Sequence, residues 1–285
     1  MPPLYRSTRV LEHFDGDSDL DLRSLGINLI YIHDWLNLDT ATDYFERLAG
    51  DKRGLRQHSY IGRFNRRVTP ARLTYAHVPS GRAYRFRGQP LTRRPSDAFT
   101  RIFEQLVERL PDALIVRPNA SVSNGYRYNG RDCIAPHTDD EKFLVRETCR
   151  YWNDATVSTV TLLRDSSERM NYFAGDPATG EGVVIAMRHG SLTIQGAVLH
   201  EVKPVRGSHP DLVSRISVTL RSLYQSCGHG ATCRKPNCAH NLGPSNYLFY
   251  SNADALLDMA SDHDSDYDII IEDEIDSATE IILDC

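Results

Sequence analysis

The stretch RISVTLR, residues 215–221, places polar and apolar side chains on opposite faces of a predicted strand. In a strand, residues two apart share a face, so both arginines lie on the polar side. Such a face is expected inside a barrel that binds a dicarboxylate, because the planar guanidinium matches carboxylate geometry. The arginines are about 20 Å apart along the strand, at about 3.3 Å per residue, so both serve one small ligand only if their side chains converge. The polar face consists of Arg215, Ser217, Thr219 and Arg221, and the apolar face of Ile216, Val218 and Leu220.

The residues upstream of this stretch predict two helices followed by many strands. Apolar residues at helical spacing, with Ser96 as a cap and Pro111 behind, predict a helix over 96–110. A second helix is expected over 40–49, with Asp39 or Thr40 as its cap. This order indicates an α+β protein with a central β-sandwich or barrel. The predicted strands are ALIVRP (113–118), VSTVTLL (157–163), GVVIAM (182–187), GSLTIQG (190–196) and RISVTLRSL (215–223).

Composition is that of an ordinary globular protein. Of 285 residues, 40% are hydrophobic and 25% are charged, and no run of about 18 apolar residues predicts a membrane span. The start, MPPLYRSTRVLEHF, lacks the apolar core of a secretory signal. The six cysteines have no disulfide-framework spacing, which indicates reduced thiols. We therefore expect an intracellular protein, with nucleus and cytoplasm both open.

Charge is distributed very unevenly along the chain. Residues 51–101 carry thirteen Lys and Arg against two Asp, and residues 251–285 carry twelve Asp and Glu with no Lys or Arg. A basic region of this density attracts polyanions such as nucleic acid; the alternative is a solvated arginine-rich surface. The acidic end could screen the basic region or form a separate recognition tail.

A metal site is indicated by histidines and carboxylates in a particular context. Two histidines and one carboxylate bind iron(II) and leave three positions open for cosubstrate and oxygen. The context of His137 stands out, because it lies in the segment NGYRYNGRDCIAPHTDDE (124–141), where Asn, Tyr, Gly and Asp precede HTDDE at fixed offsets. The segment HGSLTIQGAVLHEVKP (189–204) then places His200 just past a strand. The chain holds three His-x-Asp triplets, namely His13/Asp15, His137/Asp139 and His209/Asp211.

Taken together, segments 119–143, 189–204 and 215–223 resemble the AlkB family of iron(II)- and 2-oxoglutarate-dependent dioxygenases, and a weaker similarity runs from about residue 28 to 223. The family pattern is matched by Asn124, Tyr126, His137, Asp139, His200, Arg215 and Arg221. The resemblance implies a double-stranded β-helix (jelly roll) with helices on one side. It also implies oxidative demethylation of N-alkylated bases of the 1-methyladenine or 3-methylcytosine type in DNA or RNA.

The resemblance also assigns roles to residues. Iron(II) is bound by His137, Asp139 and His200. Arg215 pairs with the distal carboxylate of 2-oxoglutarate, assisted by Asn124 and Tyr126. Arg221 lies near the keto-acid end, and Ser217 occupies the position of a polar cosubstrate contact.

The substrate side rests on the segment ARLTYAHVPSGRAYRFRG (71–88), within a predicted lid of about 51–95. It resembles the Tyr-x-Phe-x-Gly lid of nucleic-acid repair members through Tyr84 and Phe86. Phe86 could stack on a base that has been flipped out or is single-stranded, or it is a core residue. Arg85 and Arg87 favour phosphate contact. Asp140 could accept a hydrogen bond from an exocyclic amine, or it is a surface carboxylate.

Two other functions stay open. One is an AlkB-like hydroxylase or demethylase of a protein or another substrate that is not a nucleic acid. The other is a nucleic-acid-binding module without catalysis. The basic lid argues for nucleic acid as the partner, and the intact metal triad argues for an enzyme.

Outside the predicted dioxygenase domain (26–225) lie three further segments. A flexible arm is expected over 1–25, and an acidic, disordered tail over 250–285. In the tail, Ile269, Ile270 and Ile271 resemble a SUMO-interacting motif, with Ile281–Leu283 as a weaker copy; the alternative is a tail without a partner. Between them, 226–245 predicts a structural zinc site or a loop without metal. Its ligands are Cys227, Cys233, Cys238 and His240, with His229 as an alternative.

Overall fold

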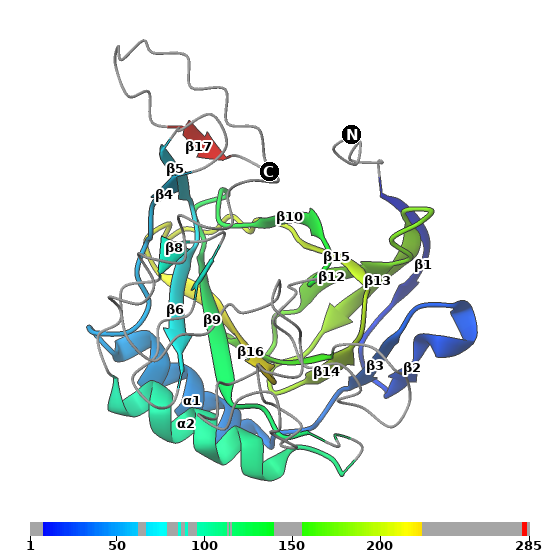
Figure 1. Ribbon diagram of the computed structural model, residues 1–285, viewed down its shortest axis with the longest axis horizontal. Helices are drawn as coiled ribbons and strands as arrows, with labels where there is room; N and C mark the ends of the chain where they lie inside the picture. The colour runs from blue at the N-terminus through cyan, green and yellow to red at the C-terminus, as the bar shows by residue number, and fades with distance from the viewer. Residues whose placement is uncertain are drawn as a thin grey trace, which may run out of the picture.

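Two β-sheets face each other around a central space, and two helices cover the outside of one sheet (Figure 1). The computed structural model describes residues 8–61, 67–78, 85–86, 89–90, 96–112, 114, 116–139, 156–223 and 281–283. The larger sheet has seven strands in the order β2 (Leu20–Asp21), β3 (Leu29–Ile32), β14 (Leu192–Gln195), β11 (Val157–Leu163), β16 (Val213–Arg221), β9 (Ala120–Arg127) and β6 (Leu73–His77). The smaller sheet has five, in the order β1 (Arg9–Phe14), β13 (Glu181–Met187), β12 (Met170–Gly175), β15 (Leu199–Val202) and β10 (Ile134–His137).

The eight strands from β9 to β16 form a jelly roll, because the chain passes back and forth between the two sheets. Four of them lie in the larger sheet in the order β14-β11-β16-β9, and four in the smaller in the order β13-β12-β15-β10. Neighbours within each group pair antiparallel. The predicted α+β class and double-stranded β-helix core are therefore confirmed.

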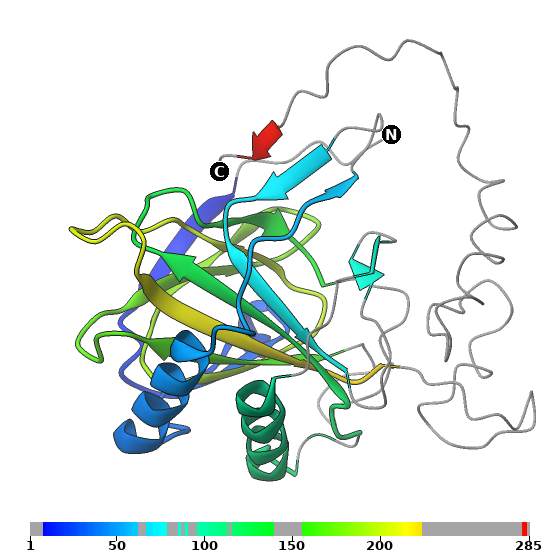
Figure 2. The ribbon, with the colours of Figure 1, turned by 90° about the vertical axis from the view of Figure 1, so that its left-hand side faces the viewer.

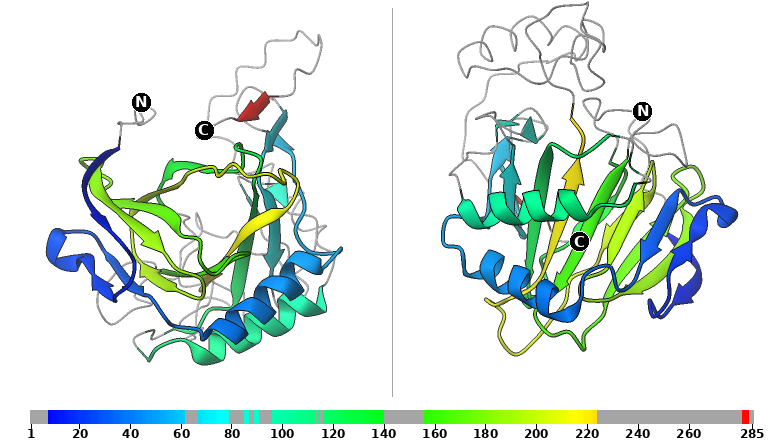
Figure 3. Two further views of the ribbon diagram at one scale, coloured as in Figure 1. Left: turned by 180° about the vertical axis from the view of Figure 1, so that it is seen from behind. Right: turned by 90° about the horizontal axis from the view of Figure 1, so that it is seen from below.

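Helices α1 (Leu38–Gly50) and α2 (Asp97–Arg109) lie across the outer face of the larger sheet (Figure 3). The predicted cap of α2 is confirmed, since the Ser96 side chain accepts the Phe99 N–H. The predicted cap of α1 is wrong. Asn37 in extended geometry accepts the Thr40 N–H, so Asp39 and Thr40 fall inside the first turn. Among the described residues, no helix has the length and apolar character needed to cross a membrane.

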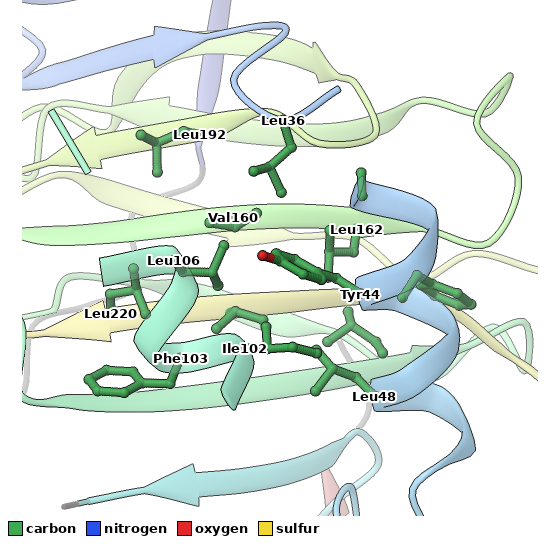
Figure 4. Close-up of a cluster of buried hydrophobic side chains, with 14 of the residues drawn as sticks. Leu36, Tyr44, Leu48, Ile102, Phe103, Leu106, Val160, Leu162, Leu192 and Leu220 are labelled. Carbon is green, nitrogen blue, oxygen red and sulfur yellow. The ribbon is translucent and has the colours of Figure 1, made fainter. Parts of the chain in front are cut away.

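The core between helices and sheet is built from the apolar face of β16 and the periodic faces of the two helices (Figure 4). Its fully buried members include Leu48 of α1, Leu106 of α2 and Leu162 of β11. The predicted division of β16 is confirmed, because its aliphatic residues join this cluster while its polar residues face the space between the sheets. The aliphatic residues are Ile216, Val218 and Leu220.

The substitution Leu162→Ala is expected to lower the free energy of unfolding by about 2–5 kcal/mol, because a fully buried side chain leaves a cavity that the surrounding core fills incompletely. Equilibrium denaturation in urea measures the change. The matched control is Leu38→Ala, since Leu38 is 57% exposed and its loss should change stability by about 0.5 kcal/mol or less. Equal effects at the two positions would contradict this account of the core.

The predicted flexible arm over 1–25 is wrong for its described part. Strand β1 pairs parallel with β13, β2 pairs with β3, and a 3-10 helix follows over Leu22–Leu25. Arg9 also forms a 2.8 Å ion pair with Glu181. Main-chain pairing at a sheet edge does not require apolar side chains on both faces, so the polar composition of the arm hid the strand.

The predicted strand over 113–118 is also wrong. Its described residues form no strand, and the next strand begins at Ala120. Instead the run connects α2 to β9: Leu114 packs into the helix-side core, and Arg117 Nη1 donates to Leu110 O at 2.7 Å. A short apolar run does not distinguish a strand from a buried connection by periodicity alone.

Two small sheets lie beyond the jelly roll (Figure 2). One contains β4 (Tyr60–Ile61), β5 (Arg67–Pro70) and β17 (Ile281–Leu283), with β17 parallel to β5. The other is the hairpin of β7 (Arg85–Phe86) and β8 (Gln89–Pro90). Within the predicted acidic tail, the three apolar residues of β17 complete the main-chain hydrogen bonds of an edge strand. The predicted disorder of the tail stays a prediction.

The expectation of reduced thiols is wrong for Cys133, which is buried and disulfide-bonded. The other five cysteines lie outside the described residues.

Candidate active site

Three potential metal ligands meet at the end of β10. His137 closes that strand, Asp139 follows two residues later, and His200 on β15 is the register partner of His137. The two imidazole centroids are 4.1 Å apart. Asp139 Oδ1 lies 3.8 Å from His137 Nε2, and Asp139 Oδ2 lies 3.8 Å from His200 Nε2. Within the described part of the chain, no other three His, Cys, Asp or Glu side chains cluster this closely. Of the three His-x-Asp triplets, the fold therefore selects His137/Asp139.

The two histidines present the same nitrogen to the cluster. His137 Nδ1 lies 3.0 Å from Ala135 O, and His200 Nδ1 lies 3.0 Å from Val198 O. A carbonyl oxygen only accepts hydrogen bonds, so each Nδ1 carries the proton and each Nε2 keeps a free lone pair. Such a bond on the remote nitrogen fixes the tautomer of a metal-binding histidine. Both imidazoles are therefore oriented as ligands by main-chain carbonyls.

Electrostatics hold His137 and Asp139 in the protonation states that a metal requires. Burial, together with the neighbouring His200, lowers the pKa of His137 to about 4, so this imidazole is neutral at physiological pH. Burial alone would raise the pKa of Asp139, but Arg221 and the two imidazoles outweigh it and hold that pKa at about 2. Arg221 Nη2 donates to Asp139 Oδ1 at 3.0 Å. Two imidazoles and one carboxylate are a ligand set that fits iron(II).

A second cationic position lies at the other end of β16. Arg215 is 3% exposed, and its guanidinium carbon lies 3.9 Å from the ring centroid of Tyr126. Burial lowers the pKa of Arg215 to about 10, so it stays charged at neutral pH. Among the described residues, neither Arg215 Nε nor Tyr126 Oη forms a hydrogen bond. Leaving such groups buried and unpaired costs about 1–3 kcal/mol each, and a bound carboxylate would satisfy both.

The remaining predicted cosubstrate residues face the same space. Asn124 and Ser217 are buried and lie opposite each other in the pairing of β9 with β16. The Asn124 Oδ1 accepts hydrogen bonds from Arg72 Nε at 3.1 Å and from Thr74 Oγ1 at 3.3 Å. Sequence reasoning missed Arg72, because nothing in the pattern links the start of ARLTY to β9.

Sequence reasoning also missed the support behind His200. The ring of Tyr172 on β12 stacks on the His200 imidazole with centroids 5.7 Å apart. Tyr172 Oη donates to Gln195 Oε1, and Gln195 Nε2 lies 3.4 Å from His200 Nδ1. Both residues are buried. A glutamine that ends the apolar strand GSLTIQG was the available signal, since a buried polar side chain in a strand needs a partner.

A buried ion pair positions the turn that leads into β10. Asp132 is 1% exposed and accepts from Arg127 N and Nε, both at 2.9 Å. It also accepts from Asn129 Nδ2 at 2.7 Å. These residues belong to the segment NGYRYNGRDC, so its fixed spacing of polar residues reflects a turn that delivers His137 to the site.

The predicted substrate, zinc and tail residues are described in part. Arg85 and Phe86 form β7, and only their backbone is described. The other predictions lie outside the described residues and stay predictions. They concern Tyr84, Arg87 and Asp140 on the substrate side, Cys227, Cys233, Cys238 and His240 for zinc, and Ile269, Ile270 and Ile271 for protein docking.

Comparison with known proteins gives one result at the level of structure. No protein-family model and no curated protein matches the sequence. Among solved structures, the chain is similar to an oxidoreductase of the 2OG-Fe(II) oxygenase family from Burkholderia pseudomallei. The two are 12% identical with a TM-score of 0.48, and the match covers 75% of this chain and 95% of that chain.

Proposed function

We propose that this protein is an iron(II)- and 2-oxoglutarate-dependent dioxygenase that removes methyl groups from bases in DNA or RNA. One observation carries the proposal: the metal-binding geometry of His137, Asp139 and His200 occurs in the same interior as buried Arg215, whose Nε has no hydrogen-bond partner among the described residues. A metal site alone would fit many functions. Together with a buried cation suited to a carboxylate, it favours a reaction that uses a dicarboxylate cosubstrate.

Each residue has a distinct task in this reaction. His137, Asp139 and His200 would hold iron(II), and Arg215 with Tyr126 would bind the distal carboxylate of 2-oxoglutarate. When bound, iron(II) supplies oxidation with dioxygen and 2-oxoglutarate: one oxygen atom enters the substrate C–H bond and the other leaves in succinate, with loss of carbon dioxide. The hydroxymethyl product on a base nitrogen then releases formaldehyde. Arg221 keeps Asp139 ionised, which preserves the ligand charge throughout.

The substrate class is supported by the charge of residues 51–101. Residues 51–101 carry thirteen Lys and Arg against two Asp, and they include the β4–β5 pair and the β7–β8 hairpin beyond the jelly roll (Figure 2). A basic segment of this density attracts the phosphate backbone of a nucleic acid. The target base must be single-stranded or flipped out to enter an enclosed site.

The test is turnover of a panel of single- and double-stranded DNA and RNA oligonucleotides carrying 1-methyladenine or 3-methylcytosine, followed by mass spectrometry. We expect loss of the methyl mass from at least one substrate, together with equimolar succinate and formaldehyde. Inert oligonucleotides alongside turnover of a methylated peptide would overturn the nucleic-acid assignment and leave the chemistry standing. No decarboxylation of 2-oxoglutarate with any substrate would overturn both.

Oligonucleotide binding provides a separate test of the basic lid. The double substitution of Arg85 and Arg87 to glutamate is expected to weaken binding by at least about tenfold and to reduce its salt dependence, because phosphate contacts release counterions. The matched control reverses the charge of Arg131 and Arg206, which are exposed in the loops near Asp132. An equal loss in the control would assign binding to net charge alone.

A further inference from the structure

Arg72 lies between Asn124, a predicted cosubstrate residue, and the strand that carries the predicted metal ligand His137. It lies in the turn between β5 and β6 and is half-buried. Its guanidinium reaches two places at once: Nε donates to Asn124 Oδ1 at 3.1 Å, and Nη1 donates to Cys133 O at 3.4 Å. Cys133 directly precedes β10, the strand that ends at His137. The Arg72 side chain thus connects the Asn124 amide to Cys133, the residue just before the strand that ends at His137.

The contact with Arg72 determines which way the Asn124 amide faces. A side-chain amide has an accepting oxygen on one side and a donating nitrogen on the other, whereas arginine only donates. Thr74 Oγ1 donates to the same Oδ1 at 3.3 Å. With two donors on the oxygen, the opposite orientation would place the amide N–H groups against the guanidinium. The Oδ1 is therefore held toward Arg72, and Nδ2 is turned away from it.

The freed amide nitrogen belongs to the face that would bind the cosubstrate. Asn124 and Tyr126 are two residues apart on β9 and share a face. Asn124 lies opposite Ser217 of β16 in register. Nδ2 makes no hydrogen bond within the described part of the chain, and a carboxylate or keto oxygen is the partner that it lacks. Arg72 is close enough to this face that its charge, after that of Arg215, opposes the rise that burial causes in the pKa of Tyr126.

We propose that Arg72 is a positioning residue, which locks the Asn124 amide with its nitrogen toward 2-oxoglutarate. This inference rests on the proposed function. Without Arg72, the amide would be less restrained, and in its flipped orientation the oxygen would face the anionic cosubstrate. The weak Thr74 contact would remain as the single restraint. The effect should fall on cosubstrate binding and not on the metal.

The experiment is a double-mutant cycle read by cosubstrate affinity. Calorimetry on protein loaded with manganese(II), which cannot complete turnover under anaerobic conditions, gives the Kd of 2-oxoglutarate for wild type, Arg72→Leu, Asn124→Ala and the double variant. We expect Arg72→Leu to weaken binding about tenfold, consistent with loss of one hydrogen bond to a charged group. The double variant should bind no more weakly than Asn124→Ala, because a residue that acts through another adds nothing once that other is gone.

Two further measurements separate positioning from general damage. The Kd of manganese(II) should stay within about twofold in Arg72→Leu, and Thr74→Val should weaken 2-oxoglutarate binding in the same direction but less. If Arg72→Leu does not fold, the same double-mutant cycle is measured with Arg72→Lys, and again with Thr74→Val, each combined with Asn124→Ala. Additive losses, or unchanged 2-oxoglutarate affinity in Arg72→Leu, would overturn the inference alone. Absence of 2-oxoglutarate binding in wild type would overturn the proposed function, and the inference with it.

Discussion

The substitution His200→Ala is expected to abolish tight metal binding and to lower turnover by at least about a thousandfold, since metal-ion catalysis contributes several kcal/mol and each 1.36 kcal/mol is a factor of ten in rate. His200 is 7% exposed, and its Nε2 lies 3.8 Å from Asp139 Oδ2, so no solvent-exposed side chain replaces it readily. A calorimetric metal titration measures the loss of metal affinity, and succinate release measures the loss of turnover.

The chain supplies matched controls for this experiment in its other His-x-Asp triplets. His13 lies on β1 and His209 in the loop after β15, and both are exposed. His13→Ala and His209→Ala should leave metal affinity and turnover within about twofold of wild type. If His209→Ala removed metal binding while His200→Ala did not, the assignment of the site would be wrong.

The substitution Arg215→Leu is expected to raise the KM for 2-oxoglutarate by about a hundredfold or more, because two charge-assisted hydrogen bonds to a carboxylate are lost at about 1.5–3 kcal/mol each. The metal affinity should change little, since Arg215 stacks on Tyr126 and does not contact the triad. Steady-state kinetics over a range of 2-oxoglutarate concentrations separate KM from kcat. Arg215→Lys should recover part of the loss, because an ammonium keeps the charge without the planar fork.

The control for Arg215 is Arg131→Gln, which removes an exposed positive charge from the loop before β10. It should leave the KM for 2-oxoglutarate unchanged. Activation of Arg215→Leu by monocarboxylic keto acids, which lack the distal carboxylate, would support a direct contact. An unchanged KM in Arg215→Leu would instead place the distal carboxylate elsewhere.

The structure shows what each of the two arginines of β16 contacts. The two guanidinium groups have different partners. Arg221 is engaged by Asp139 at 3.0 Å, whereas Arg215 lies against Tyr126. One arginine therefore tunes the metal ligand, and the other is available for the cosubstrate. The residue alternation predicted a shared face, but only the positions of Asp139 and Tyr126 separated the two tasks.

Much of this protein was readable from local pattern. The two faces of β16 and the periodic face and Ser96 cap of α2 were predicted from neighbours within a few residues, because side-chain periodicity and capping depend on them. The jelly roll and the metal-binding roles were implied instead by the resemblance to the AlkB family. That resemblance rests on the order along the chain of Asn124, Tyr126, His137, Asp139, His200, Arg215 and Arg221.

Tertiary structure alone decided the features that depend on contacts between distant segments. It brought His137 and His200, 63 residues apart in the chain, into register through the pairing of β10 with β15. It turned the polar arm into β1 by adding it to the edge of β13, and it placed Arg72 against Asn124 and Tyr172 behind His200. These contacts are set by strand register and sheet order, which no short window of residues encodes, because each pairing is stabilised by main-chain groups and by packing that exist only once the two sheets have closed.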